Sequence, residues 1–121
     1  DYLWAYWTVE GFQDEAHIRS IKHMLSQPGV LAATLGYYRA MLDQDKFNPE
    51  HADLRLRMAR PIGVPTLALC GAEDLRAELM LDQSQYFTSE YDFQLIDKAG
   101  HFLHREQPQA VTAQILAWLK K

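Results

Sequence analysis

The run VPTLALCG, residues 64–71, constrains the fold more than any other stretch of this chain. It is apolar almost throughout and is bounded by proline and glycine. That pattern is typical of a strand that is buried on both faces, as the strands of parallel sheets are. The run therefore predicts a parallel sheet in an α/β fold.

The rest of the second half continues the alternation. Residues 77–87 are expected to form a weakly periodic helix, and residues 92–97 a second strand. A final helix is expected from residue 107, because Val111, Ile115 and Trp118 share one face and two lysines close the segment. Strand, helix, strand and helix in this order predict two parallel strands joined by a crossover.

The first half predicts helices only. Residues 13–27 carry an apolar face, and residues 28–43 start with Pro28, which suits a first helical turn. The second of these helices has two apolar stripes, which indicates that it is contacted on two sides. One stripe holds Leu31, Leu35, Tyr38 and Leu42, and the other holds Val30, Tyr37 and Met41. Residues 44–61 are expected to form a loop and a short helix.

Composition argues against several classes of function. The chain has 121 residues with 48% hydrophobic content, enough for one globular domain at most. Its net charge of -4 and the lack of a basic patch argue against a nucleic-acid partner. The apolar runs are too short to cross a membrane, and the first residues lack the basic region of a signal peptide. The single Cys70 fits a reducing compartment, so a cytoplasmic location is expected.

Two reactive side chains follow the two predicted strands. Asp74 lies three residues after Gly71, and His101 follows Gly100. The carboxyl ends of parallel strands meet at one edge, where sites lie in open α/β sheets. We therefore expect the Asp74 carboxylate to accept a hydrogen bond from His101, leaving the other ring nitrogen free as a general base. Gly100 is expected to let the backbone turn sharply so that the imidazole points into a cleft.

The pattern VPTLALCGAED…AGHFLHREQPQAV…ILAWL resembles the C-terminal third of the α/β-hydrolases. The resemblance implies that Asp74 is the acid and His101 the base of a catalytic triad. Glu106 and Pro108 match the family's positions before the last helix. No metal and no organic cofactor are implied.

The first half is similar to the helical cap of capped members of that family. Residues 27–42, which contain YYRA, look like a cap helix of the epoxide hydrolase and dehalogenase-like branch. The expected organisation is a cap segment over residues 1–60 and a C-terminal core part over residues 61–121. The expected fold class is thus a partial α/β-hydrolase fold, with a helical cap followed by the last two parallel strands.

The family's nucleophile elbow, G-x-S-x-G or its Asp version, does not occur here. The resemblance therefore implies that the chain needs the N-terminal half of the same fold as a partner, and that alone it is inactive. The open edge of the strand at residues 64–71 invites pairing with another copy. We expect a homo-oligomer, formed by dimerisation or domain swapping.

Five aromatic residues are expected to line an apolar pocket for a small-molecule substrate, because such pockets are often aromatic-lined. They are Trp4, Trp7, Tyr37, Tyr38 and Phe102. Packing in the cap core is the alternative for the tryptophans and tyrosines. In the epoxide hydrolase branch, cap tyrosines donate hydrogen bonds to the epoxide oxygen, and either Tyr37 or Tyr38 resembles one of them.

Competing assignments remain for the polar residues. Asp74 is also a candidate helix N-cap, and Glu73 is a neighbouring acid. His101 and His104 form a His-x-x-His pair, which invites a metal site, although zinc needs three or four ligands.

Three functions follow from these assignments. The first is a triad hydrolase that acts on an ester-like or related substrate through a Ser or Asp nucleophile outside this chain, so that esterase, epoxide and haloalkane chemistry all stay open. The second is a non-catalytic fragment or self-associating module. The third is a small metal-binding domain.

Overall fold

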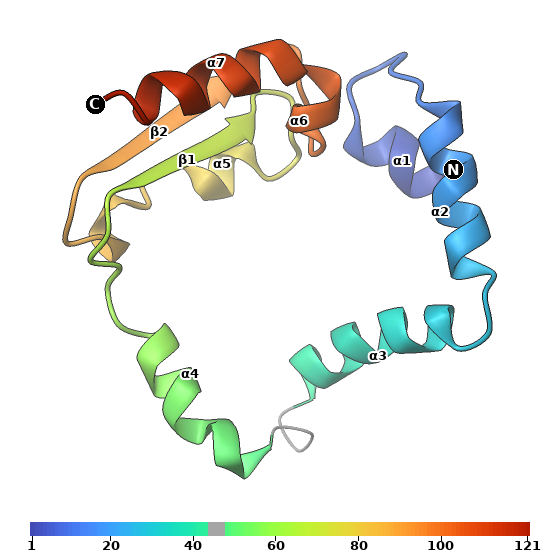
Figure 1. Ribbon diagram of the computed structural model, residues 1–121, viewed down its shortest axis with the longest axis horizontal. Helices are drawn as coiled ribbons and strands as arrows, with labels where there is room; N and C mark the ends of the chain where they lie inside the picture. Colours follow the sequence, from blue (N-terminus) through green and yellow to red (C-terminus); the bar gives the residue numbers. More distant parts are fainter. Residues whose placement is uncertain (44–47) are drawn as a thin grey trace. The chain divides into compact units, whose positions relative to one another are not determined.

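The computed structural model describes residues 1–43 and 48–121 (Figure 1). They divide into two compact units, one made of Asp1–Phe12 with Pro61–Lys121 and the other of Gln13–Arg60. Within the first unit, residues 1–12 group with residues 61–121. The organisation expected from the sequence, a cap segment over residues 1–60 and a core part over residues 61–121, stays a prediction.

The first unit contains two parallel strands, β1 (Thr66–Gly71) and β2 (Tyr91–Ile96). Their register pairs Thr66 with Tyr91 and Gly71 with Ile96. The predicted parallel arrangement is confirmed, with β1 starting two residues later and β2 one residue earlier than expected. A single bridge between Ile62 and Phe87 continues the pairing before the strands begin.

The first unit also contains four helices and a 3-10 turn within the described residues. They are α1 (Tyr2–Trp7), α5 (Ala77–Met80), the 3-10 turn η3 (Ser84–Tyr86), α6 (Leu103–Glu106) and α7 (Pro108–Trp118). The predicted final helix is confirmed as α7, and Pro108 occupies its first turn. The predicted helix over 77–87 is wrong, because it ends after Met80. Asp82 has a left-handed backbone with φ of 56°, which an α-helix cannot contain.

The core of this unit lies where β2 leads into its loop. Ile96, Ala99 and Val111 are buried, and Leu69 and Leu103 pack against them. Helices α7 and α5 both contact β1 and lie on opposite sides of it in Figure 1. Residue 99 belongs both to this core and to the loop that carries His101, so core packing anchors the loop.

The second unit consists of α2 (Glu15–Leu25), α3 (Val30–Leu42), the 3-10 turn η2 (Pro49–His51) and α4 (Ala52–Met58). Asp14 caps α2 by accepting a hydrogen bond from the backbone N–H of His17 at 3.1 Å. Pro28 does not start α3 as expected. The N-cap is Gly29 with φ of 80°, a left-handed conformation that glycine adopts at little steric cost, so the helix begins at Val30.

The loop and short helix expected over 44–61 are confirmed where the structure describes them, as η2 and α4. Residues 44–47 of that prediction lie outside the described residues. The two apolar stripes of α3 are mostly exposed, with Leu42 80% exposed and Tyr37 69% exposed. Contacts on both sides of α3 therefore stay a prediction.

Candidate active site

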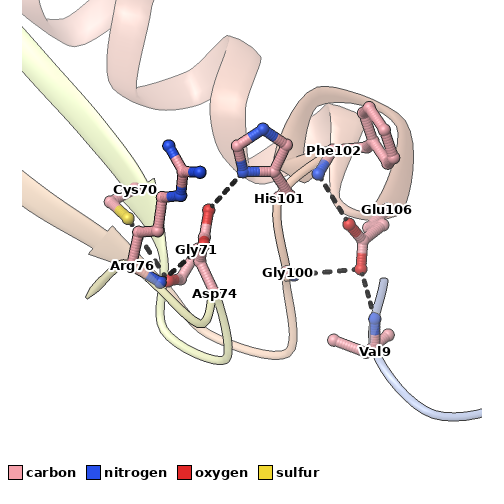
Figure 2. A network of polar contacts seen from close by, with 9 residues as sticks. All are labelled: Val9, Cys70, Gly71, Asp74, Arg76, Gly100, His101, Phe102 and Glu106. Atoms are coloured by element: carbon pink, nitrogen blue, oxygen red, sulfur yellow. Dashed lines mark hydrogen bonds and ion pairs between the residues drawn. The ribbon is translucent and has the colours of Figure 1, made fainter. Parts of the chain in front are cut away.

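The structure brings His101 and Asp74 together, as the order of strands and loops predicts. Nδ1 of His101 lies 2.8 Å from Oδ2 of Asp74 (Figure 2). The Asp74 side chain is 7% exposed and that of His101 is 38% exposed. An ionised carboxylate only accepts hydrogen bonds, so it selects the tautomer with hydrogen on Nδ1. Nε2 then carries a free lone pair.

Backbone contacts hold the two loops against each other. The N–H of Ala72 donates to the carbonyl of Ile96 and that of Glu73 to the carbonyl of Ala99, both at 2.9 Å. Gly71 is required at the end of β1, because a Cβ there would overlap the carbonyl groups of Ala99 and Gly100. The missing side chain lets the loops approach closely enough for the His101–Asp74 hydrogen bond.

Asp74 also organises its own loop. Its second oxygen, Oδ1, accepts a hydrogen bond from the backbone N–H of Arg76 at 2.8 Å. This is the local turn that aspartate favours, two residues ahead of its own position. The N-cap of α5 is Arg76, so Asp74 is not the N-cap proposed as an alternative. The neighbouring acid Glu73 is exposed.

The loop that carries His101 turns at a residue that the sequence did not single out. Lys98 has a left-handed φ of 54°, whereas Gly100 does not have a positive φ. Gly100 is needed for space, since a Cβ there would lie 2.6 Å from the carbonyl oxygen of Trp7. The glycine therefore serves close packing against residues 7 and 8, and the expected sharp turn at Gly100 was misplaced.

Glu106 is the polar residue whose role sequence reasoning missed. It is only 9% exposed, and its carboxylate accepts hydrogen bonds from the backbone N–H groups of Val9, Gly100 and Phe102. Its position before the last helix was noted only as a match to a family pattern. A glutamate just before a helix that starts with proline is normally expected to be exposed to solvent. Nothing in the sequence therefore indicated that Glu106 is buried.

Aromatic rings surround the imidazole on one side. The Trp7 ring centroid lies 5.0 Å from that of His101, and the Phe102 centroid 5.5 Å. Trp4 is buried and stacks on Phe102 at 4.9 Å and on Phe12 at 6.0 Å, so it acts as core under the site. Of the five predicted substrate-binding residues, Trp7 and Phe102 lie beside His101, and Trp4 packs against Phe102. Their role in binding substrate stays a prediction.

Tyr37 and Tyr38 lie on α3 in the other compact unit. Their rings contact each other edge to face, with centroids 5.6 Å apart. Both are exposed. Their role in binding substrate stays a prediction.

The cysteine and the second histidine of the His-x-x-His pair show no features of a reactive or metal-binding site. Cys70 is buried, and desolvation followed by the Asp74 charge raises the pKa of its thiol above the ordinary 9.0. His104 is exposed, and no three metal-ligating side chains gather anywhere in residues 1–43 and 48–121. Over the same residues, no helix has the length and apolar character needed to cross a membrane.

Comparison with known proteins shows which proteins this chain is similar to. No protein-family model matches the chain. It is 30% identical to epoxide hydrolase 3 of Xenopus tropicalis over 93% of its length, and 33% identical to epoxide hydrolase 2 of Caenorhabditis elegans over 84%. The crystal structure of wild-type Cfl2 from Burkholderia cenocepacia superposes with a TM-score of 0.68 at 21% identity, covering 87% of this chain. These matches support an α/β-hydrolase-like family for the chain.

The match covers only part of each of these proteins. The chain spans 29% and 26% of the two epoxide hydrolases and 34% of the Burkholderia protein. The likeness to the Burkholderia protein supports the fold, a mixed α/β arrangement with two parallel strands. That His101 is the base and Asp74 the acid of a catalytic triad stays a prediction.

Proposed function

We propose that this chain supplies the acid–base half of an α/β-hydrolase that hydrolyses epoxides. The observation that carries the proposal is the 2.8 Å hydrogen bond between Asp74 and His101 at the ends of two paired parallel strands. The reaction class is supported by the two relatives, both of which are named as epoxide hydrolases. The nucleophile comes from sequence outside this chain.

The chemistry assigned to His101 is general base catalysis at Nε2. A carboxylate nucleophile attacks one epoxide carbon, the ring C–O bond breaks, and a donor protonates the oxygen, which gives a covalent ester. His101 then takes a proton from water, whose oxygen attacks the ester carbonyl. The ester C–O bond breaks, and the leaving alkoxide takes the proton from His101 to give the diol. The new carboxyl group returns its proton to the donor, which restores the carboxylate, the donor and the neutral His101. The sum is one epoxide and one water converted to one diol.

The surroundings of the pair suit these two roles. Asp74 is almost wholly sheltered from water, which strengthens its attraction for the imidazolium that forms when Nε2 accepts a proton. His101 is 38% exposed, so water and substrate can reach the ring. The Asp74 oxygen that is not bonded to the ring is held by Arg76, which prevents the carboxylate from rotating away.

The aromatic residues are assigned to substrate binding in this proposal. Trp7 and Phe102 flank the imidazole and give an apolar wall beside the reacting atoms. The resemblance to the epoxide hydrolase branch makes the hydroxyl of Tyr37 or Tyr38 the candidate for protonating the epoxide oxygen. An aryl or alkyl epoxide is therefore the substrate class that we expect.

Turnover by the intact protein tests the proposal. Styrene oxide and a p-nitrophenyl ester are offered separately to the wild type and to His101→Gln. We expect diol formation from the epoxide by the wild type and a loss of at least about 1,000-fold in the variant. Hydrolysis of the ester alone would favour a serine nucleophile. Equal rates for the wild type and the variant would overturn the role of His101.

A further inference from the structure

We propose that Glu106 is a positioning residue, whose carboxylate fixes the backbone around His101 and joins it to residues 7–9. We call its three hydrogen bonds, to the backbone N–H groups of Val9, Gly100 and Phe102, the lock. The catalytic consequence of this lock rests on the proposed function, whereas the lock itself does not. Glu106 accepts hydrogen bonds from the backbone N–H groups on either side of His101, so it acts on the imidazole through the backbone.

The hydrogen bonds enclose His101 from both sides. Oε2 of Glu106 accepts from the N–H of Gly100 at 2.9 Å, and Oε1 accepts from the N–H of Phe102 at 3.0 Å (Figure 2). The N–H of His101 itself donates to the carbonyl of Trp7 at 2.7 Å. Three consecutive backbone N–H groups therefore have fixed acceptors. Such a backbone leaves the imidazole little freedom other than rotation about its own side-chain bonds.

The same carboxylate reaches a distant part of the chain. Oε2 of Glu106 also accepts from the N–H of Val9 at 2.8 Å. Because Trp7 accepts from His101, residues 7 and 9 are both bound to the His101 loop. This segment comes just before the unit Gln13–Arg60 in the sequence. A shift of residues 7–9 is thus transmitted to the backbone of His101.

The chemistry of the site fits a carboxylate and no other side chain. All three partners are N–H donors, and a carboxylate offers acceptors only. A glutamine at this position would direct its NH₂ group at one or two of these donors. The bonds to a charged acceptor are also stronger than those between neutral groups. Glu106→Gln is therefore a change of almost no volume that breaks part of the lock.

The first measurement is made on the intact wild-type protein by NMR. Couplings across hydrogen bonds are sought between the side-chain carboxyl carbon of Glu106 and the backbone nitrogens of Val9, Gly100 and Phe102. We expect all three couplings. Their absence would overturn the lock even if every Glu106 variant failed to fold.

The second measurement compares Glu106→Gln with Glu10→Gln, which makes the same chemical change at an exposed position near residue 9. We expect amide exchange at Val9, Gly100 and Phe102 to rise at least about 10-fold in Glu106→Gln alone, as local opening becomes easier. We also expect the Nδ1 proton resonance of His101 to shift. Unchanged exchange and an unchanged resonance in a folded Glu106→Gln protein would overturn the proposal.

The third measurement separates positioning from mere stability. In the intact enzyme, Glu106→Gln is expected to lower kcat about 10–100-fold with little change in KM, since misplacing a reacting group acts on the chemical step. Glu106→Asp keeps the charge and is expected to recover part of kcat. A fall in kcat without a shift of the His101 resonance would contradict positioning. If the wild type hydrolyses neither substrate, the proposed function fails. The couplings across hydrogen bonds and the amide exchange rates would still show whether Glu106 holds the backbone of His101.

Discussion

At the scale of single residues, the His101–Asp74 pair could be predicted because it depends on a general rule. Side chains that follow neighbouring parallel strands converge at one sheet edge, so two short loops sufficed to pair them. The place of Trp7 and the burial of Glu106 could not be predicted in this way. Both depend on residues 7–9 folding against a loop far away in sequence, and no local pattern records such a contact.

Replacing Asp74 tests the pair directly. Asp74→Asn keeps the shape but removes the charge, and the amide can favour the wrong tautomer of His101. We expect kcat of the intact enzyme to fall by about 10,000-fold, the loss seen for the analogous change in a serine protease triad. Glu73→Gln, the same change at the exposed neighbour, should leave kcat near the wild-type value. Full activity of Asp74→Asn would contradict the assignment of the acid.

Cys70 gives a prediction about pH. Burial, and then the charge of Asp74, raises the pKa of this thiol in the folded chain above the ordinary 9.0. A group with a raised pKa favours the folded state below the unfolded value, and that contribution is lost as pH rises through the folded value. We therefore expect Cys70 to resist alkylation at pH 8 and stability to fall above about pH 9.

Iodoacetamide labelling followed by mass measurement checks this prediction, because Cys70 is the only cysteine in the chain. Denatured protein serves as the control and should label much faster. Fast labelling of the native protein at pH 8 would show that the thiol is open to solvent. Cys70→Ala should remove this thiol's share of the loss of stability at high pH.

At the scale of elements, hydrophobic patterns predicted β1, β2, α2, α3 and α7 but placed some ends wrongly. Long apolar or periodic segments can be recognised in the sequence, whereas the point at which a helix ends or begins depends on the backbone conformation of a single residue. The left-handed Asp82 ends the helix expected to run to residue 87, and the left-handed Gly29 delays the start of α3. Neither residue type breaks a helix in every context, so the sequence pattern alone did not locate these breaks.

Gly71 is the element boundary most sensitive to substitution. A methyl group at this position would collide with backbone atoms of Ala99 and Gly100, which cannot move without displacing the His101 loop. We expect Gly71→Ala to destabilise the protein by about 1–3 kcal/mol. Gly36→Ala is the matched control, because a Cβ at residue 36 would meet no atom within 4 Å and alanine favours the helix by about 1 kcal/mol. Chemical denaturation of both variants measures the difference.

If Gly71→Ala were as stable as the wild type, the close packing of the two loops would be contradicted. A second measurement shows whether the loss of stability comes from displacement of the His101 loop. The Nδ1 proton resonance of His101 should move in Gly71→Ala and stay in place in Gly36→Ala.

The predicted self-association depends on the edge of β1 that faces away from β2. The N–H of Thr66 donates to the carbonyl of Glu90, just before β2, and that of Ala72 donates to the carbonyl of Ile96 in β2. Successive residues of a parallel strand alternate in direction, so Leu67 and Leu69 direct their N–H groups to the other edge. Within the described residues, that edge has no partner strand. We expect residues 1–121, produced without further sequence, to associate along this edge.

Leu67→Pro removes one N–H from that edge without touching the bonds to β2. We expect the variant to sediment as a monomer, whereas Leu67→Ala, which keeps the N–H, should still associate. A monomeric wild-type chain, or equal association of both variants, would show that the edge is not the contact.

At the scale of the whole molecule, the chain matches only a part of each of its relatives. It spans less than a third of each epoxide hydrolase that it resembles, with coverage of 29% and 26%. The described helices α2 and α3 contain no buried residue, and Met58 at the end of α4 is 84% exposed. We expect sequence outside these residues to cover such surfaces and to supply the nucleophile.

The most direct test of the central claim is the mass of the intact His101→Gln protein after incubation with an epoxide. Attack by a carboxylate nucleophile does not need His101, whereas hydrolysis of the resulting ester does. We predict that the variant gains the mass of one epoxide molecule per chain and keeps it, while the wild type returns to its original mass. A variant that gains no mass, or one that turns over the epoxide as fast as the wild type, would contradict the assignment of His101 as the base of an epoxide hydrolase.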